Sequence, residues 1–164
     1  MARVIQINIS PGGLPKRPIT EARVTPLGIA GDGFAHPHVH GGPKQALLLI
    51  CCEVVDDLAR HGYPIYYGAM GENLTVAGID HRSFRAGQRY RIGSEVVIEL
   101  TKPRGPCRAL DVYGVDFRSL VYDALVKSGD PSSRVWGKSG FYASVISGGI
   151  VVPGAPIGLL DQLA

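Results

Sequence analysis

Residues 88–101, QRYRIGSEVVIELT, decide the class of fold that the sequence predicts. Two runs rich in β-branched and aromatic residues flank Gly93-Ser94, a pattern typical of antiparallel strands joined by a two-residue turn. Similar short runs predict further strands over residues 3–9, 21–27, 73–76, 142–146 and 157–160. Residues 45–52 are almost entirely apolar and fit either a buried strand or the start of a helix.

Helical spacing of apolar residues is confined to residues 53–60 and 117–127. The 22 Gly and 12 Pro among 164 residues suit short strands and many turns better than long helices. About eight or nine strands, two helices and no repeated strand–helix–strand order predict a mainly antiparallel β-barrel. The length fits one domain, residues 1–164.

Composition and charge exclude several classes of protein. The formal net charge of +3 is too mild to predict a nucleic-acid partner, whereas a small anionic molecule needs only two or three placed cations. No run reaches the roughly 18 apolar residues of a membrane span, and the N-terminal residues do not resemble a secretory signal. The odd number of cysteines argues against a disulfide framework and predicts a reducing, cytoplasmic location.

Cys107 is the most informative thiol in the sequence. Pro103 and Pro106 stiffen the backbone before it, while Arg104 and Arg108 can stabilise a thiolate. A fixed thiolate among cations suits a soft metal or a persulfide. The alternative is an inert, buried cysteine after a strand, as expected for Cys51 and Cys52 in their apolar run.

Three histidines, His36, His38 and His40, form a second candidate site. In an extended segment these alternate residues face the same way and could hold zinc with an open position for water, as in a hydrolase. The segment is rich in Gly and Pro, however, and a solvated surface cluster of histidines is the commoner arrangement.

Two acidic residues that follow glycines, Asp32 and Glu72, are further candidates. Either carboxylate could orient His40 or a substrate amine, and Asn73 could hydrogen-bond a polar ligand. The alternative for each is a structural role in a turn. Gly137-Lys138-Ser139-Gly140 lacks the spacing of a Walker loop, although its amides and Lys138 could contact a phosphate.

Together these segments resemble the MOSC domain, the C-terminal domain of molybdenum-cofactor sulfurases. The resemblance extends over residues 20–160 and rests on motifs found in the family's order. The motifs are GIAGD (28–32), HGG (40–42) with Lys44 and Ala46, GENLT (71–75), RIG (91–93), PRGPC (103–107) and GFY (140–142). Ser144 and Gly154-Ala155 depart from the family, which often has Arg and Gly-Asp there.

The resemblance implies a β-barrel related to a domain of pyruvate kinase, and it implies a cofactor. Cys107 would be the ligand of molybdenum carried by a pterin dithiolene, as in amidoxime-reducing enzymes. Arg104 would lie near the cofactor, and His40, Glu72 and Asn73 would line the pocket, with Asp32 beside them. Pyridoxal phosphate is not expected, because in sulfurases it belongs to a separate domain.

The resemblance and the residues together imply three alternative functions. The first is a molybdenum-cofactor oxidoreductase that acts on N-hydroxylated small molecules and receives electrons from a redox partner protein. The second is a non-catalytic carrier of persulfide sulfur or of the cofactor, with Cys107 charged by a cysteine desulfurase. The third, a lesser alternative, is a zinc hydrolase using His36, His38 and His40.

Overall fold

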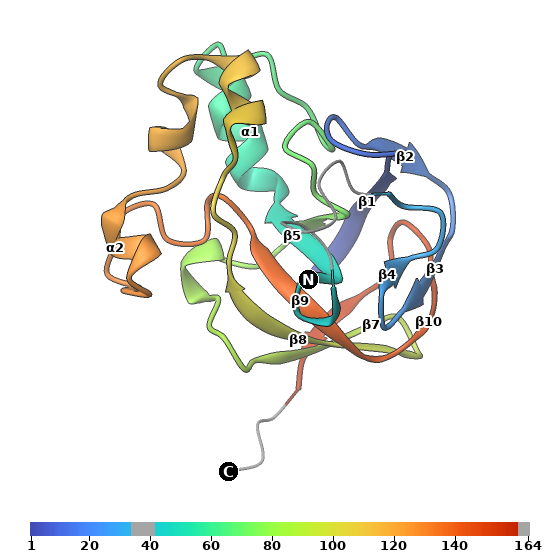
Figure 1. Ribbon diagram of the computed structural model, residues 1–164. Coiled ribbons are helices and arrows are strands. Elements are labelled where there is room, and N and C mark those ends of the chain that lie inside the picture. The colour runs from blue at the N-terminus through green and yellow to red at the C-terminus, as the bar shows by residue number, and fades with distance from the viewer. Residues whose placement is uncertain (34–41, 161–164) are drawn as a thin grey trace.

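The fold is mainly β, as the sequence predicts, and is described by a computed structural model over residues 1–33 and 42–160 (Figure 1). Eight strands form one sheet in the order β11-β7-β8-β9-β5-β6-β1-β2. Their bounds in chain order are β1 (Arg3–Ile9), β2 (Arg17–Ile19), β5 (Leu47–Cys51), β6 (Leu74–Ala77), β7 (Arg89–Ile92), β8 (Val96–Pro103), β9 (Phe141–Ser147) and β11 (Ile157–Leu159). A three-stranded sheet, β10-β3-β4, comprises β3 (Ala22–Thr25), β4 (Gly28–Ile29) and β10 (Gly149–Val151).

The expected closed barrel is not found among the described residues, because no ladder joins the end strands β11 and β2. Backbone hydrogen bonds instead join the segment before β11 to the start of β1. The Val4 amide donates to the Ala155 carbonyl at 2.9 Å, and the Gly154 amide donates to the Val4 carbonyl at 2.7 Å. The short strand β2 contains Pro18, which has no N–H to donate, and this suits β2 to the edge of a sheet.

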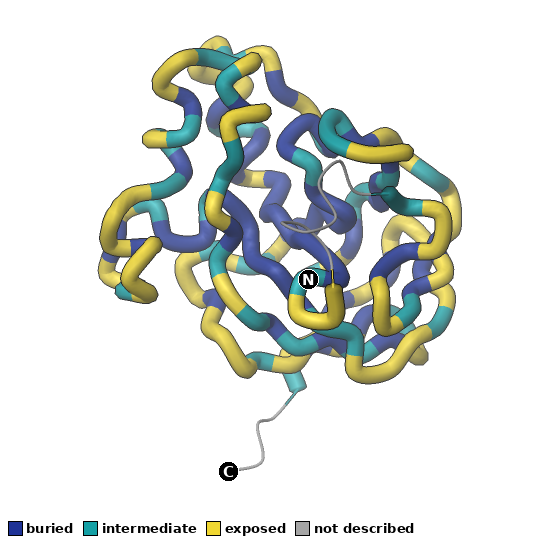
Figure 2. The backbone as a smooth tube through the Cα atoms, viewed as in Figure 1, coloured by how far each residue is buried: buried dark blue, intermediate teal, exposed yellow. Residues whose placement is uncertain are grey.

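The fold contains one strand–helix–strand unit, although the sequence predicts no repeated order of this kind. The apolar run forms β5, all five residues of which are buried, and α1 (Cys52–Arg60) follows directly. Strand β5 then pairs with β6 in parallel. The helix buries Val54, Val55 and Leu58, which is the face that their spacing predicts. Figure 1 shows α1 beside β5, and Figure 2 shows this part of the sheet as mostly buried.

The hairpin at the centre of the sequence argument is confirmed, with a longer turn than expected. Strands β7 and β8 pair antiparallel, and Ile92 lies opposite Val96, so three residues rather than two make the turn. Gly93 has a φ of +64°, in the left-handed region that glycine tolerates best. Strand β8 lies between β7 and β9 in the sheet, and its C-terminal end leads to Cys107.

The predicted helix over residues 117–127 is wrong as a continuous element. Two short helices occur there, the 3-10 helix η4 (Phe117–Leu120) and α2 (Ala124–Lys127). Asp123 has an extended backbone and its side chain accepts a hydrogen bond from the Val126 amide at 2.9 Å. This N-cap begins a new helix where the pattern suggested continuation. Phe117 and Val126 are nevertheless buried, so the spacing of apolar residues correctly indicates that these two side chains pack in the core.

The remaining helical turns are three 3-10 helices that connect strands: η1 (Pro43–Gln45), η2 (His81–Ser83) and η3 (Arg108–Tyr113). Within the described ranges, no helix combines the length and the apolar character needed to cross a membrane. The expected strands over residues 3–9, 21–27, 73–76, 142–146 and 157–160 correspond to β1, β3, β6, β9 and β11, with ends that shift by a few residues.

Candidate functional site around Cys107

The chain reaches Cys107 directly from the sheet. Strand β8 ends at Pro103, four residues without regular structure follow, the last of them Cys107, and η3 begins at Arg108. Cys107 is half-buried, whereas Cys51 and Cys52 are buried as predicted. Burial is the main cause that raises the pKa of the Cys51 thiol far above its ordinary value and that of Cys52 to about 11. Cys107 is therefore the thiol of this chain that is best placed to meet a ligand.

Arg104 is held rigidly beside this segment. It is 4% exposed, and its amide donates to the Gly140 carbonyl at 2.8 Å. The Ser139 hydroxyl donates to the Arg104 carbonyl at 2.6 Å, and the Arg104 guanidinium donates back to the Ser139 carbonyl at 3.4 Å. The Gly-Lys-Ser-Gly segment thus anchors an arginine. Arg104 Nε is buried and has no hydrogen-bond partner within the described ranges.

Glu72 lies close to this guanidinium and is fully buried. Burial raises the pKa of its carboxyl above the ordinary value, against smaller lowering effects from the amides of Gly68 and Glu72, the Thr75 hydroxyl and the Arg104 charge. One carboxyl oxygen accepts from Thr75 Oγ1 at 3.1 Å, while Oε1 has no partner in the part of the chain described. A carboxyl in this environment favours its neutral form, which can hold a proton.

Two tyrosines that sequence reasoning did not select complete the cluster. Burial raises the pKa of Tyr113 to about 12, with smaller effects from Tyr66, Glu72 and Arg104, and its hydroxyl donates to the Ala69 carbonyl at 2.5 Å. Burial also raises the pKa of Tyr142, with smaller effects from Arg104 and Cys107. Tyr142 stands in the Gly-Phe-Tyr motif, so its position was visible in the sequence, whereas no local signal marks Tyr113.

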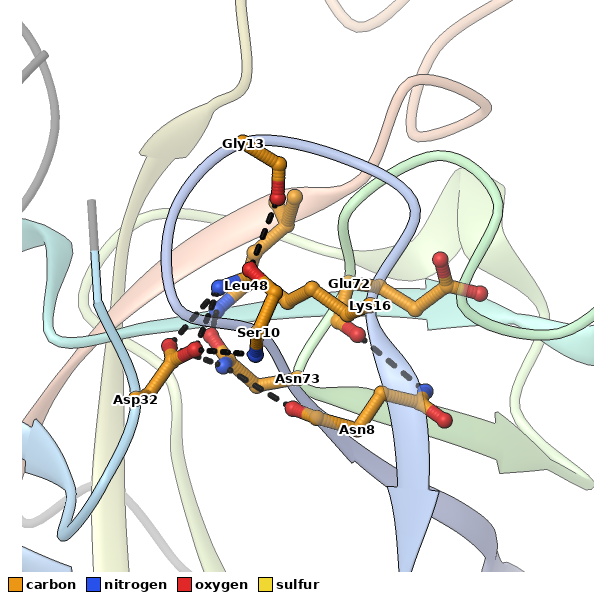
Figure 3. Close-up of polar contacts among 8 residues, drawn as sticks. All are labelled: Asn8, Ser10, Gly13, Lys16, Asp32, Leu48, Glu72 and Asn73. Atoms are coloured by element: carbon orange, nitrogen blue, oxygen red, sulfur yellow. Dashed lines mark hydrogen bonds and ion pairs between the residues drawn. The ribbon is translucent and has the colours of Figure 1, made fainter. Parts of the chain in front are cut away.

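Asp32 and Asn73 form a different cluster, an internal polar network (Figure 3). Asp32 pairs with Lys16 at 2.6 Å, and it accepts from the Ser10 amide at 3.0 Å and from Asn73 Nδ2 at 2.8 Å. Asn73 Oδ1 accepts from the Leu48 amide at 3.0 Å. These contacts connect the residues that follow β1, those that follow β4 and those that precede β6 to strand β5. The polar atoms of the Asp32 and Asn73 side chains thus all have partners within the protein.

Glu72 connects the two clusters. Its backbone carbonyl accepts from Asn8 Nδ2 at 3.1 Å, while its carboxyl group points away from Asp32 and Asn73 in Figure 3. The structure therefore brings Glu72 and Arg104 together and places Asp32 and Asn73 in the internal polar network. His40, with His36 and His38, lies outside the described residues. Among the residues described, no group of three or more His, Cys, Asp or Glu side chains could hold a metal ion.

A pocket of about 510 Å³ adjoins the segment that carries Cys107. Its walls come from the end of β8, from β9, from η1 and from α2. The residues that line it are Gln45, Lys102, Pro103, Gly105, Tyr122, Val126, Lys127, Ser128, Gly129 and Tyr142. Tyr142 thus belongs both to this pocket and to the surroundings of Arg104 and Cys107.

Comparison with known proteins assigns the chain to a family. The family model of the MOSC domain matches residues 36–158, and the chain belongs to that family. The crystal structure of YiiM from Geobacillus stearothermophilus has the same fold, with a TM-score of 0.71 and 25% identity over 98% of this chain and 76% of that one.

Two curated relatives match most of this chain. YflK of Bacillus subtilis (strain 168) is 33% identical over 156 residues, and YiiM of Escherichia coli (strain K12) is 32% identical over 149. The matches cover 92% and 88% of this chain but 64% and 61% of the relatives, so the chain spans less than two thirds of their lengths. A shorter match, 31% identical over 88 residues, relates 51% of this chain to 16% of a Gibberella moniliformis protein named Reductase.

Proposed function

We propose that this MOSC domain binds a molybdenum cofactor through Cys107 and takes part in the reduction of N-hydroxylated compounds. One observation carries the proposal: the half-buried Cys107 thiol follows a segment in which the buried Nε of Arg104 has no hydrogen-bond partner among the residues that the structure describes. Membership of the MOSC family and the short match to a protein named Reductase support it.

The residues present fit such a cofactor. A thiolate is the soft ligand that a thiophilic metal requires, and Cys107 is the accessible source of one. Buried polar atoms in proteins nearly always have partners, so the unpartnered Arg104 Nε invites an acceptor such as the anionic part of a cofactor. Cys107 would hold the metal and Arg104 the anionic part. When bound, the cofactor would supply a centre for two-electron redox chemistry.

The reaction breaks the N–O bond of the N-hydroxylated compound. The nitrogen gains a hydrogen in place of the hydroxyl group, and the oxygen leaves as water. Two electrons and two protons are consumed, one proton ending on the nitrogen and one in the water. The electrons come from a redox partner protein, a role that fits a flavin or iron–sulfur protein. In this chain Arg104 would hold negative charge in place. The buried carboxyl of Glu72, whose pKa burial raises, would lie near that charge.

Metal content after expression in a host that makes the cofactor tests this function. We expect the wild-type chain to retain molybdenum and Cys107→Ser to lose it, because a hydroxyl is a harder and weaker ligand. Cys52→Ser is the matched control, since it removes a buried thiol elsewhere, and it should keep its molybdenum. Negligible molybdenum in the wild type, or equal amounts in the wild type and Cys107→Ser, contradicts the proposal.

The partial exposure of Cys107 also supports a second function, the transport of sulfur within a reducing cytoplasm. A cysteine desulfurase would pass the outer sulfur of its persulfide to the Cys107 thiolate, which becomes the persulfide while the desulfurase recovers its thiol. Intact-protein mass spectrometry should then show the addition of one sulfur atom to the wild type and to Cys52→Ser but not to Cys107→Ser. Equal gains in all three proteins would exclude this route.

A further inference from the structure

Among the described residues, those that line the pocket beside Cys107 include two lysines and no acidic residue. Lys102 at the end of β8 and Lys127 at the end of α2 both line it, and none of the residues lining it is Asp or Glu. We propose that this pocket binds the carboxylate of an aromatic substrate. The inference rests on the proposed function and specifies its substrate class: an N-hydroxylated aromatic compound that carries a carboxylate.

The charges of the two lysines are available to a ligand. Across residues 1–33 and 42–160, neither lysine has a carboxylate within ion-pair distance. The carboxylates that flank α2 are engaged elsewhere: Asp123 accepts from the Val126 amide at 2.9 Å and Asp130 from the Ser132 amide at 2.9 Å. An anion that enters the pocket therefore meets uncompensated positive charge, which favours its binding.

The walls of the pocket suit an aromatic ring. Tyr122 and Tyr142 supply aromatic surface, and Lys102 Nζ lies 6.0 Å from the centre of the Tyr142 ring. A Cβ atom at Gly105 would lie 3.7 Å from the Tyr122 hydroxyl, so a glycine here keeps the space before that ring open. The volume of about 510 Å³ lies in the range of pockets that enclose small molecules.

The pocket lies beside the segment that leads to Cys107. Lys102 lies opposite Tyr142 in the β8–β9 ladder, and Pro103 lies opposite Phe141. Gly105, which also lines the pocket, precedes Cys107 by two residues. A substrate whose carboxylate meets the lysines would thus lie along the segment that leads to the thiol. Ring stacking on tyrosine and pairing with lysine together give the pocket its selectivity.

A pair of probes that differ by one group tests the inference. Calorimetric titration would compare 4-carboxybenzamidoxime with benzamidoxime, which lacks the carboxylate, using protein purified from a cofactor-producing host. We expect the carboxylate probe to bind about tenfold more tightly, which corresponds to the ~1.4 kcal/mol expected of one modest charge-assisted contact. Lys127→Gln and Lys102→Gln should each remove most of this preference, because each removes one of the two charges that the carboxylate would meet.

Arg60→Gln is the matched control, because it removes an exposed positive charge that does not line the pocket. Equal affinity of the wild type for the two probes would overturn the inference, as would an equal loss of preference in Arg60→Gln. Its failure is distinguishable from failure of the proposed function. A preference for the carboxylate without bound molybdenum supports the pocket alone, and bound molybdenum without that preference supports the cofactor role alone.

Discussion

Substitution of Asp32 by asparagine should destabilise the fold more than any substitution of a surface ion pair. The Asp32 side chain is 3% exposed and pairs with Lys16, whose side chain is 9% exposed. Asparagine keeps the volume, but its amide nitrogen would face a donor, either the Ser10 amide or Asn73 Nδ2. Removing one partner of a buried ion pair costs about 3–5 kcal/mol. In a chain of this size that loss lowers Tm by about 6–20 °C.

Urea unfolding followed by circular dichroism would measure this loss. The control is Glu99→Gln, which breaks the Arg89–Glu99 pair at 3.0 Å, where the side chains are 50% and 33% exposed. Exposed pairs contribute at most about 1 kcal/mol, so this variant should unfold close to the wild type. If Asp32→Asn lost no more stability than Glu99→Gln, the internal polar network would not be the structural element described above.

Three further measurements test other parts of the structure. Maleimide should label one thiol per native chain and none in Cys107→Ser, because Cys51 and Cys52 are buried and burial raises their pKa values; two labelled thiols would contradict this. Gly68→Ala should lose far more stability than Gly129→Ala, because both glycines have positive φ but only at Gly68 would a Cβ meet backbone, 2.2 Å from the Lys16 carbonyl oxygen; similar losses would show that the backbone yields there. Burial raises the pKa of Glu72 in the folded state, so the stability that this carboxyl contributes is present below pH 4.5 and is lost as the pH rises. Glu72→Gln should therefore reduce the fall in the free energy of unfolding with rising pH, measured by urea unfolding. An unchanged pH dependence in this variant would refute the raised pKa of Glu72.

The sequence predicted the local elements of the fold better than its closure. Alternation and turn residues located the β7–β8 hairpin and most other strands, since both signals are local. Closure into a barrel depends on how distant strands meet, and the bonds between Val4 and residues 154–155 have no signature in either segment. The parallel pairing of β5 with β6 was also hidden, because β6 has four residues and the apolar run before α1 fits either element.

The sequence could predict those residues of the candidate site that stand together in one short segment. Pro103, Arg104 and Cys107 stand within five residues of one another in the sequence, so their proximity in the fold could be predicted from the sequence. Tyr113, in η3, and Ser139, in the segment before β9, reach Arg104 or its surroundings through tertiary packing alone. No spacing rule connects these residues to Arg104, because each belongs to a different loop.

The consecutive residues Glu72 and Asn73 connect the surroundings of Cys107 to the internal polar network. The sequence analysis expected both side chains to line the pocket, whereas the structure gives them different surroundings. Asn73 forms hydrogen bonds with Asp32 and with the Leu48 amide, whereas the carboxyl group of the preceding Glu72 points away from them (Figure 3). That carboxyl group interacts electrostatically with Arg104 instead. A change at Asn73 therefore acts on the site by displacing Glu72, while a change at Glu72 alters the charge next to Arg104 directly. The first should lower stability and molybdenum retention together, and the second should lower retention in a protein whose fold is preserved.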